Sequence, residues 1–365
     1  MRNSQTSGLD QHGRAGVAML GAMQKFASSH VRNAARRAYE GTPEAQATLT
    51  APEGADRLRI MAWVQQSRAI AERQPLYRIE RFMQAYVAQS IYEFGIPAVE
   101  ARRAQFTAEP DAFVDDRIEL DPDLVLPDYH DCDWHLRPGG WDGYDLYGPH
   151  GVHVVKPIFA LGGFAAAPVG ANIGQHRLDV VAQLPRRDYA RIYEPGCGNG
   201  STLIAIHRRF PGAELVASDL SAEQLRAARR LTGTLSIPVT LRQRDAATDT
   251  GEADATFDAV VTFALHHELP HAANVALLKE MFRILKPGGD IILSDPPPFR
   301  AVDAFHAVLL DWDTDNRAEP FFSEAGASDW GAEMERIGFV DVTARPLGPD
   351  SYPWVTIARK PGDGG

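Results

Sequence analysis

An acidic residue followed by three closely spaced glycines marks the stretch of this chain best suited to chemistry. Residues 192–202 read IYEPGCGNGST, with Glu194 ahead of Gly196, Gly198 and Gly200. Because glycine has no Cβ atom, a ligand can approach the backbone closely at these positions. The surrounding apolar patterns predict a buried strand before the loop and a helix after it, with the first amides of the helix pointing at the loop. This order of elements is typical of nucleotide sites in open α/β sheets.

The spacing of the glycines separates two classes of nucleotide. A dinucleotide loop follows Gly-x-Gly-x-x-Gly, whereas this loop follows Gly-x-Gly-x-Gly and has Ser201 where the third glycine of that pattern belongs. Asp219 ends the next predicted strand, residues 214–219, where a carboxylate can accept hydrogen bonds from both hydroxyls of a ribose. The spacing therefore disfavours a nicotinamide cofactor and favours another nucleoside-containing ligand.

Strand and helix patterns alternate through the second half of the chain. The predicted strands are residues 190–194, 214–219, 239–244, 257–265 and 290–294, with two later β-like segments at 339–344 and 354–360. Such alternation predicts an α/β fold, a Rossmann-like mostly parallel sheet with helices on both faces.

Four further positions follow the glycine loop in a family-specific order. They are Asp219, the pair Asp245-Ala246, the run FALHH at residues 263–267, and the turn LKPGGD at residues 285–290. With them, residues 186–360 resemble the class I S-adenosylmethionine (SAM)-dependent methyltransferases, whose first motif is an acidic residue followed by Gly-x-Gly-x-Gly. The resemblance implies that SAM is the cofactor.

The resemblance also implies which residues hold SAM. An acid and two glycines surround the methionine moiety, an acid and its neighbour hold the ribose and the adenine edge, a second acid and its neighbour contact the adenine, and two residues of the fourth strand line the cofactor. In that order these positions are Glu194, Gly196, Gly198, Asp219, Leu220, Asp245, Ala246, Phe263 and Ala264.

Two adjacent histidines, His266 and His267, are the candidates for proton transfer. They follow the fourth predicted strand, at the sheet edge where substrates bind in this architecture. Because adjacent strand residues point to opposite faces, we expect one histidine in the site and the other in the body of the domain. We place His267 on the acceptor side, as a general base or orienting donor. The alternative is that both histidines make structural hydrogen bonds.

Substrate contacts are expected from three places. Asp295 ends the fifth predicted strand and faces the cleft. The segment 115–149 is rich in acids, prolines and aromatics and carries Trp141 and Tyr147, while the segment 305–319 carries His306 and Trp312. Aromatic walls with a few polar groups suit a pocket for a small organic molecule, although burial of these aromatic residues would explain them equally well. No tight chelating spacing joins the histidines to Asp295, so no metal site is predicted.

The remainder of the chain is expected to be mostly helical. Apolar periodicity predicts helices at residues 15–39, 56–72 and 77–94. We therefore divide the chain into a disordered tail at residues 1–14, a mostly α accessory, dimerisation and lid region at 15–185, and a SAM-binding methyltransferase domain at 186–365. This plan looks like that of dimeric small-molecule O-methyltransferases, and the resemblance implies a possible homodimer.

Composition excludes several classes of partner. The net charge of −11 and the pI of about 5.6 argue against a nucleic-acid substrate. No apolar run approaches the length of a membrane span. The two cysteines, Cys132 and Cys197, form no Cys-x-x-Cys zinc pattern and indicate a reducing compartment. We expect a cytoplasmic protein.

The function expected from these observations is SAM-dependent methylation of a small-molecule acceptor in a biosynthetic pathway of specialised metabolism. An oxygen acceptor is favoured over carbon or nitrogen. One alternative is a non-methylation reaction on the same fold, such as decarboxylation or cyclisation. A non-enzymatic binding protein is the other, and the intact glycine loop with both nucleoside-binding acids argues against it.

Overall fold

The structure, a computed structural model, describes residues 8–107 and 118–362. These residues form two compact units, each assembled from separated segments of the chain. The first unit contains residues 8–107, 132–172 and 297–327, and the second contains residues 118–131, 173–296 and 328–362. The observed division differs from the predicted single boundary at 185/186, because the second unit takes up a segment that precedes this boundary and releases one that follows it.

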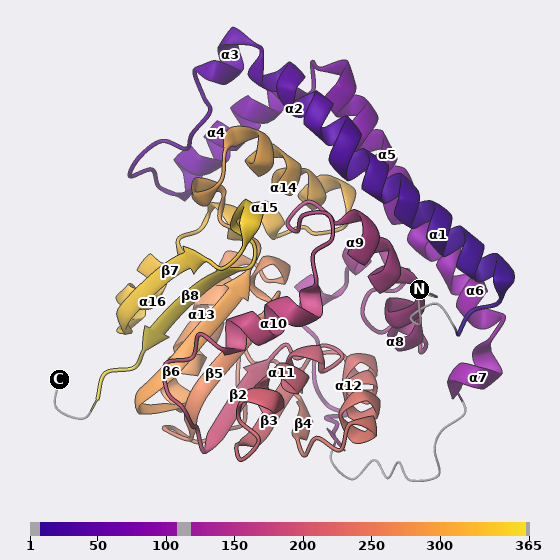
Figure 1. Ribbon diagram of the computed structural model, residues 1–365. Coiled ribbons are helices and arrows are strands. Elements are labelled where there is room, and N and C mark those ends of the chain that lie inside the picture. The colour runs from indigo at the N-terminus through magenta and orange to yellow at the C-terminus, as the bar shows by residue number, and fades with distance from the viewer. Residues whose placement is uncertain (1–7, 108–117, 363–365) are drawn as a thin grey trace. The chain divides into compact units, whose positions relative to one another are not determined.

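The first unit is helical (Figure 1). Its helices are α1 (Gln11–Phe26), α2 (Arg32–Glu40), α3 (Pro43–Gln46), α4 (Arg57–Ala71), α5 (Pro75–Glu93), α6 (Gly95–Glu100), α7 (Arg103–Thr107), α8 (Tyr147–His150), α9 (Lys156–Gly162), α14 (Ala304–Asn316) and α15 (Phe322–Ala327). Short π or 3-10 turns are η2 (Ala27–Val31), η4 (Trp134–Leu136), η5 (Gly151–Val155) and η7 (Phe299–Ala301). The prediction of a mostly α region is confirmed for this unit.

The start of the described chain corrects one expectation. The predicted disordered tail at residues 1–14 lies partly outside the described residues, but its end belongs to α1. The Asp10 carboxylate accepts a hydrogen bond from the Gly13 backbone N–H at 2.7 Å and caps this helix. Leu9 is buried in the apolar core of the first unit. A side-chain cap and a buried leucine thus order this end of the helix.

The second unit is an α/β sandwich (Figure 1). Within the described ranges its sheet has eight strands in the order β1-β4-β3-β2-β5-β6-β8-β7. They are β1 (Ile118–Glu119), β2 (Arg191–Pro195), β3 (Glu214–Asp219), β4 (Thr240–Gln243), β5 (Phe257–Phe263), β6 (Leu285–Asp295), β7 (Val340–Pro346) and β8 (Trp354–Arg359). The strands from β1 to β6 pair in parallel, and β8 runs antiparallel to both β6 and β7.

Helices cover both faces of this sheet. The helices are α10 (Ile173–Val181), α11 (Ser201–Arg209), α12 (Ala222–Thr234), α13 (His271–Ile284) and α16 (Trp330–Ile337), with 3-10 turns η3 (Asp128–His130), η6 (His266–Glu268) and η8 (Pro349–Ser351). Apolar residues of α10, α11 and α12 pack on one face, and those of α13 and α16 pack on the other. The predicted Rossmann-like fold is confirmed.

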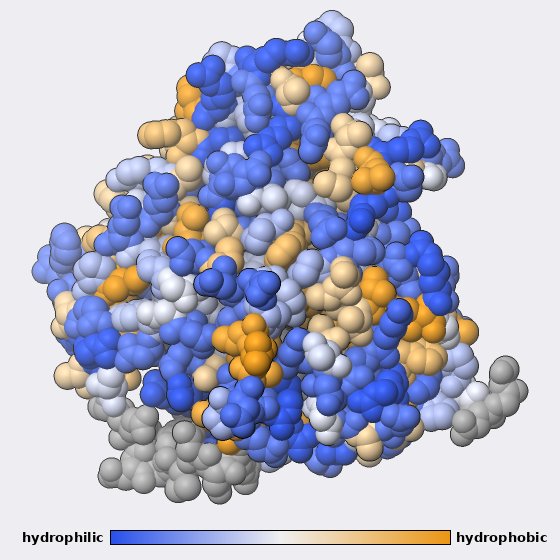
Figure 2. All heavy atoms as spheres, turned by 180° about the vertical axis from the view of Figure 1, so that it is seen from behind, coloured by the Kyte–Doolittle hydropathy of each residue, from blue (hydrophilic) through white to orange (hydrophobic). Residues whose placement is uncertain are grey.

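One face of the molecule is mostly polar. Figure 2 shows hydrophilic residues over most of one face, with apolar residues gathered in separate small patches. Among the described residues, no helix combines the length and the hydropathy needed to cross a bilayer.

Candidate functional site

The carboxyl ends of the parallel strands gather the predicted site residues at one edge of the second unit. Parallel strands that lie side by side end at the same edge of their sheet, which is where ligands of this architecture bind. Glu194 lies near the end of β2, Asp219 ends β3, Asp245 follows β4, Phe263 ends β5 and Asp295 ends β6. The sheet therefore brings together residues that are about a hundred positions apart in the sequence.

The glycine loop joins β2 to α11 with a conformation that side chains tolerate poorly. Gly196 has φ +60° and Gly200 has φ +77°. A Cβ atom on Gly196 would lie 2.5 Å from a methyl carbon of Leu265, and one on Gly200 would lie 3.1 Å from the Cβ of Ala228. The backbone conformation therefore requires glycine at both positions, whether or not a ligand is bound.

Glu194 is a buried carboxyl group at the inner side of this loop. Only 2% of the residue is exposed, and its Oε2 atom has no hydrogen-bond partner. Burial raises the pKa of Glu194 to about 8, although Thr202 and Arg177 both act to lower it. A buried acid with an unused oxygen is suited to accept a cationic group of a ligand, since a nearby positive charge would favour the ionised form.

Asp219 is held by the backbone on both of its oxygens. The N–H of Gly198 donates to Oδ2 at 2.8 Å, and the N–H of Ser221 donates to Oδ1 at 2.9 Å. Burial nevertheless raises the pKa of Asp219 to about 6. These two bonds tie the glycine loop to the end of β3 and fix the direction of the carboxylate, as binding a diol would require.

Asp245 closes the turn that follows β4. Its Oδ1 accepts from the N–H of Ala247 at 3.1 Å and its Oδ2 from the hydroxyl of Thr248 at 2.6 Å. Ala246 is buried in the apolar cluster beside this turn. Leu220 is half-buried, and its carbonyl accepts a hydrogen bond from the Gln243 side chain at 3.0 Å. The predicted adenine-side residues therefore lie at the ends of two neighbouring strands.

Phe263, which contacts Arg177, ends β5, and Ala264 follows it. The Phe263 ring lies under the guanidinium of Arg177, with 4.4 Å between the Cζ atom and the ring centroid. The N–H of Ala264 donates to the carbonyl of Ser294 at 2.7 Å, which joins the ends of β5 and β6. Burial lowers the pKa of Arg177. Arg177 also donates to Thr202 at 3.2 Å, so it stands next to the glycine loop.

His266 is committed to the interior of the second unit. It is fully buried, with the Thr262 hydroxyl 3.0 Å from Nε2 and the side-chain Oδ1 of Asn274 2.7 Å from Nδ1. Burial lowers the pKa of His266. Both ring nitrogens are used by the fold, so the geometry supports a structural role for this predicted catalytic residue.

His267 has a different environment and pairs with Asp295. Its Nδ1 lies 2.7 Å from Oδ1 of Asp295, and its Nε2 lies 4.0 Å from Oε1 of Glu268. The two histidines lie in the 3-10 turn η6 after β5, so the alternation of strand side chains is the wrong reason for their different environments. The imidazole–carboxylate pair is the arrangement that orients a histidine for proton transfer.

The remaining predicted substrate residues belong to the first unit. Tyr147 is buried and donates to the Pro138 carbonyl at 2.8 Å. Trp141 is half-buried and lies against Arg137, 4.2 Å from the Cζ atom to the ring centroid. His306 and Trp312 are buried on α14. The contacts of Tyr147 support packing, which leaves Asp295 as the predicted substrate residue that lies at the strand ends.

The described residues contain no group of three or more histidines, cysteines, aspartates or glutamates that could hold a metal ion.

Sequence reasoning missed three residues of this edge. Arg177 lies on α10, which the sequence indicated only as a helix leading into the domain. Tyr129 and His130 lie in the segment 118–131, whose start forms the short strand β1. A two-residue strand gives no detectable periodicity. The sequence feature that could have indicated Tyr129 and His130 was the run of acids and aromatics between residues 115 and 149.

Part of this chain is similar to known methyltransferases. Residues 192–289 match a family model described as "Methyltransferase domain". The chain is 28% identical to methyltransferase phqN of Penicillium fellutanum over 210 residues. This alignment covers 53% of this chain and 60% of that protein. The chain is 32% identical over 118 residues to a ubiquinone biosynthesis O-methyltransferase of Xanthomonas campestris, which covers 32% and 48%. A trans-aconitate 2-methyltransferase of Azoarcus is 33% identical over 119 residues, covering 32% and 44%. The chain spans about half the length of these relatives.

Proposed function

We propose that the second unit is a class I SAM-dependent methyltransferase domain and that it transfers the methyl group of SAM to an oxygen atom of a small-molecule acceptor in a biosynthetic pathway. The observation that carries the proposal is the pair formed by His267 and Asp295 at the strand ends that hold the glycine loop. An oxygen nucleophile must lose its proton on methylation, and an oriented imidazole can take it.

The residues at this edge fit the chemistry of SAM. SAM supplies an electrophilic methyl group on a positively charged sulfur. Glu194 offers a buried carboxyl with an unused oxygen to the positive charges of the methionine end. Asp219 would hold the ribose hydroxyls, with Leu220 beside it, and the turn at Asp245 and Ala246 would meet the adenine. Gly196, Gly198, Phe263 and Ala264 would form the walls.

His267 and Asp295 would have different roles in proton transfer. With the Nδ1 proton donated to the Asp295 carboxylate, the lone pair of His267 is at Nε2. This nitrogen would accept the proton of the acceptor hydroxyl, and Asp295 would stabilise the positive charge that then forms on the ring. Because methyl transfer is an in-line displacement, much of the rate would come from orienting the two reactants.

Binding and product analysis test this proposal. Calorimetric titration of the purified chain should give binding of both SAM and S-adenosylhomocysteine. Incubation with SAM and small phenols or carboxylic acids should then yield S-adenosylhomocysteine and a methylated acceptor. Phenols and carboxylic acids are chosen because the relatives include a ubiquinone biosynthesis O-methyltransferase and a trans-aconitate 2-methyltransferase. Turnover of SAM without S-adenosylhomocysteine would favour the alternative, a decarboxylation or cyclisation on the same fold.

A homodimer is the assembly that we propose. The first unit exposes apolar side chains along α5 at helical spacing, among them Ile79, Phe82 and Tyr86, and Phe82 is 70% exposed. Exposed apolar surface of this kind favours a protein partner, and a second copy of the chain is the partner we propose. Sedimentation velocity should show a dimer that Phe82→Glu weakens, and a monomeric wild type would refute this part of the proposal.

The cytoplasm is the compartment that we propose. Both Cys132 and Cys197 are thiols, and thiols persist in reducing compartments. Cys197 lies inside the glycine loop, where a disulfide would obstruct a ligand. Subcellular fractionation should recover the protein with cytoplasmic markers.

A further inference from the structure

A segment outside the matched family region leads onto the ligand edge of the second unit. Strand β1 pairs in parallel with β4, so that Ile118 lies opposite Leu241 and Glu119 opposite Arg242. Because the two strands run in the same direction, the chain that leaves β1 emerges at the edge where Asp245 follows β4. Residues 118–131, here called the strap, thus enter the second unit from the edge of the sheet nearest to the predicted adenine site.

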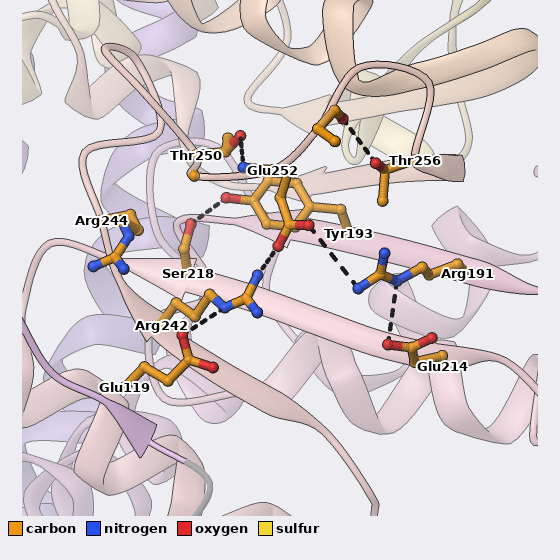
Figure 3. A network of polar contacts seen from close by, with 12 residues as sticks. Glu119, Arg191, Tyr193, Glu214, Ser218, Arg242, Arg244, Thr250, Glu252 and Thr256 are labelled. Carbon is orange, nitrogen blue, oxygen red and sulfur yellow. Dashed lines mark hydrogen bonds and ion pairs between the residues drawn. The ribbon is translucent and has the colours of Figure 1, made fainter.

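Polar contacts anchor the start of the strap to β4 and the residue after it. The Glu119 carboxylate pairs with Arg242 at 2.8 Å, and the Asp121 carboxylate pairs with Arg244 at 3.2 Å. The N–H of Asp121 also donates to the side chain of Gln243 at 3.2 Å. In Figure 3, Glu119 and Glu252 both reach the guanidinium of Arg242. Three consecutive residues from the end of β4 onward therefore hold the strap.

The end of the strap faces the two nucleoside-binding acids. The hydroxyl of Tyr129 lies 3.5 Å from Oδ1 of Asp245. The half-buried Tyr129 ring packs against the apolar cluster that contains Ala246. The next residue, His130, interacts electrostatically with Asp219 and acts to lower the pKa of that carboxyl group. Tyr129 thus contacts the turn after β4, and His130 lies within electrostatic range of the carboxylate that ends β3.

The contact between Tyr129 and Asp245 is not needed to hold the turn after β4. Asp245 keeps two shorter hydrogen bonds within that turn, from Ala247 and Thr248. The phenol contact, at 3.5 Å, is the long one. A purine amine could take this place on the carboxylate while the ring of Tyr129 remains as a wall of the site.

We propose that the strap forms part of the cofactor site and closes its adenosine half, with the Tyr129 ring against the adenine and His130 beside the ribose-binding carboxylate of Asp219. This inference rests on the proposed function. The ligand group recognised is adenosine, which SAM and S-adenosylhomocysteine share. Tyr129 is accordingly a binding residue, and Glu119 acts through the strap as a positioning residue.

Substitution of Tyr129 tests the proposal directly. Calorimetry should show that Tyr129→Ala weakens binding of SAM, S-adenosylhomocysteine and 5′-methylthioadenosine alike, by about tenfold, because an aromatic wall under a base contributes on that order. Tyr129→Phe should keep most of the affinity, since it keeps the ring. Phe26→Ala, a truncation of an exposed aromatic residue on α1, should leave all three affinities unchanged.

A matched pair of carboxylate variants tests the anchoring. Glu119 and Glu214 are both exposed, and each pairs with a strand arginine that Glu252 also contacts (Figure 3). Of the two, only Glu119 belongs to the strap. Glu119→Ala should weaken SAM binding by about two- to fivefold, the size of one surface ion pair, and Glu214→Ala should not.

The possible outcomes distinguish a failure of the proposal about the strap from a failure of the proposed function. A wild-type chain that binds neither SAM nor S-adenosylhomocysteine would refute both. If the wild-type chain binds SAM and the folded Tyr129→Ala and Glu119→Ala variants bind it equally well, the proposal that the strap forms part of the cofactor site is wrong. The proposed function would be unaffected by that result. Circular dichroism and thermal unfolding of each variant report whether it is folded.

Discussion

The Nδ1 atom of His267 lies 2.7 Å from the Oδ1 atom of Asp295, although 27 residues separate the two positions in the chain. Asp295 ends β6 and His267 lies in the turn after β5, so the pairing of these neighbouring parallel strands creates the contact. His266, the adjacent residue, is held instead by Thr262 and Asn274. One turn thus presents one histidine to the interior and the other to a carboxylate.

This pair leads to the first prediction. We expect His267→Ala to lower kcat by about a hundredfold, the usual contribution of a positioned base, and to leave the Kd for SAM nearly unchanged. Asp295→Asn should lower kcat in the same direction, because the imidazole loses its orienting charge. In both variants the rate should recover as the pH rises and the acceptor ionises by itself. Steady-state kinetics over a pH series, with calorimetry for SAM, measures these effects.

His271→Ala is the control for this prediction. His271 begins α13 in the same unit, where its Nδ1 lies 3.2 Å from the Ser328 hydroxyl. This variant should keep the wild-type kcat and pH profile. A decrease of only a fewfold in kcat for His267→Ala would assign that residue a structural role.

The second prediction concerns Asp219 as the ribose acceptor. Asp219→Ala removes the carboxylate that Gly198 and Ser221 fix in place. SAM and S-adenosylhomocysteine should both bind more weakly by about 1–3 kcal/mol, the range for loss of hydrogen bonds to a charged group. Asp249→Ala is the matched control, since Asp249 also accepts a backbone N–H, that of Gly251 at 2.8 Å, but in an exposed loop. Near wild-type affinity in Asp219→Ala would refute the assignment of this strand end.

The third prediction follows from the raised pKa of Glu194. This pKa is about 8 in the folded chain against an ordinary value of 4.5, so between these pH values the folded state binds more protons than the unfolded state. Stability without cofactor should therefore fall as the pH rises, by up to about 1.4 kcal/mol per pH unit. The pKa of Asp219 is also raised, to about 6, so it too makes stability fall as the pH rises. That fall is nearly complete above pH 6, where Asp219 is ionised in both states.

Urea unfolding at pH 6.5 and pH 8 isolates the contribution of Glu194. Glu194→Gln should gain stability over the wild type as the pH increases between these values. Glu214→Gln, a change to an exposed glutamate on the neighbouring strand β3, controls for the loss of one negative charge. Saturating SAM should reduce the difference, because a bound cation favours the ionised carboxylate. Parallel curves for wild type and Glu194→Gln would contradict the prediction.

The fourth prediction tests the glycine loop. Gly196→Ala places a methyl group 2.5 Å from Leu265 at a φ of +60°, so the loop must shift. We expect a loss of stability of about 1–3 kcal/mol and loss of measurable SAM binding. Gly212→Ala is the control, since that position has open space and no positive φ. A Gly196→Ala variant with wild-type melting temperature and SAM affinity would show that the loop tolerates the methyl group.

Local patterns were sufficient for the second unit. Glycine spacing, the acids at strand ends and the alternation of strands with helices are all properties of short segments, so the Rossmann-like fold and the match to a methyltransferase domain could be predicted from them. The strand-end acids were good candidates because this fold places the carboxyl ends of its parallel strands at one edge of the sheet. The short strand β1 was missed, since two residues carry no period.

The division of the chain could not be read in the same way. Residues 118–131 join the second unit and residues 297–327 join the first, because each packs with elements remote in sequence. The predicted boundary at 185/186 rested on a change of pattern along the chain, which carries no information on such exchanges. Tyr147 shows the same limit, since its aromatic character is equally suited to a pocket wall and to the core where it lies.

The amino-acid sequence by itself determined the glycine loop, the acids that follow the strands and the presence of two adjacent histidines, because each depends on residues within one strand–loop–helix segment. The tertiary structure decided which histidine pairs with Asp295, which aromatic residues are core, and that Tyr129 meets Asp245. Those relations depend on the register of paired strands and on the burial of side chains, and only the folded chain sets both.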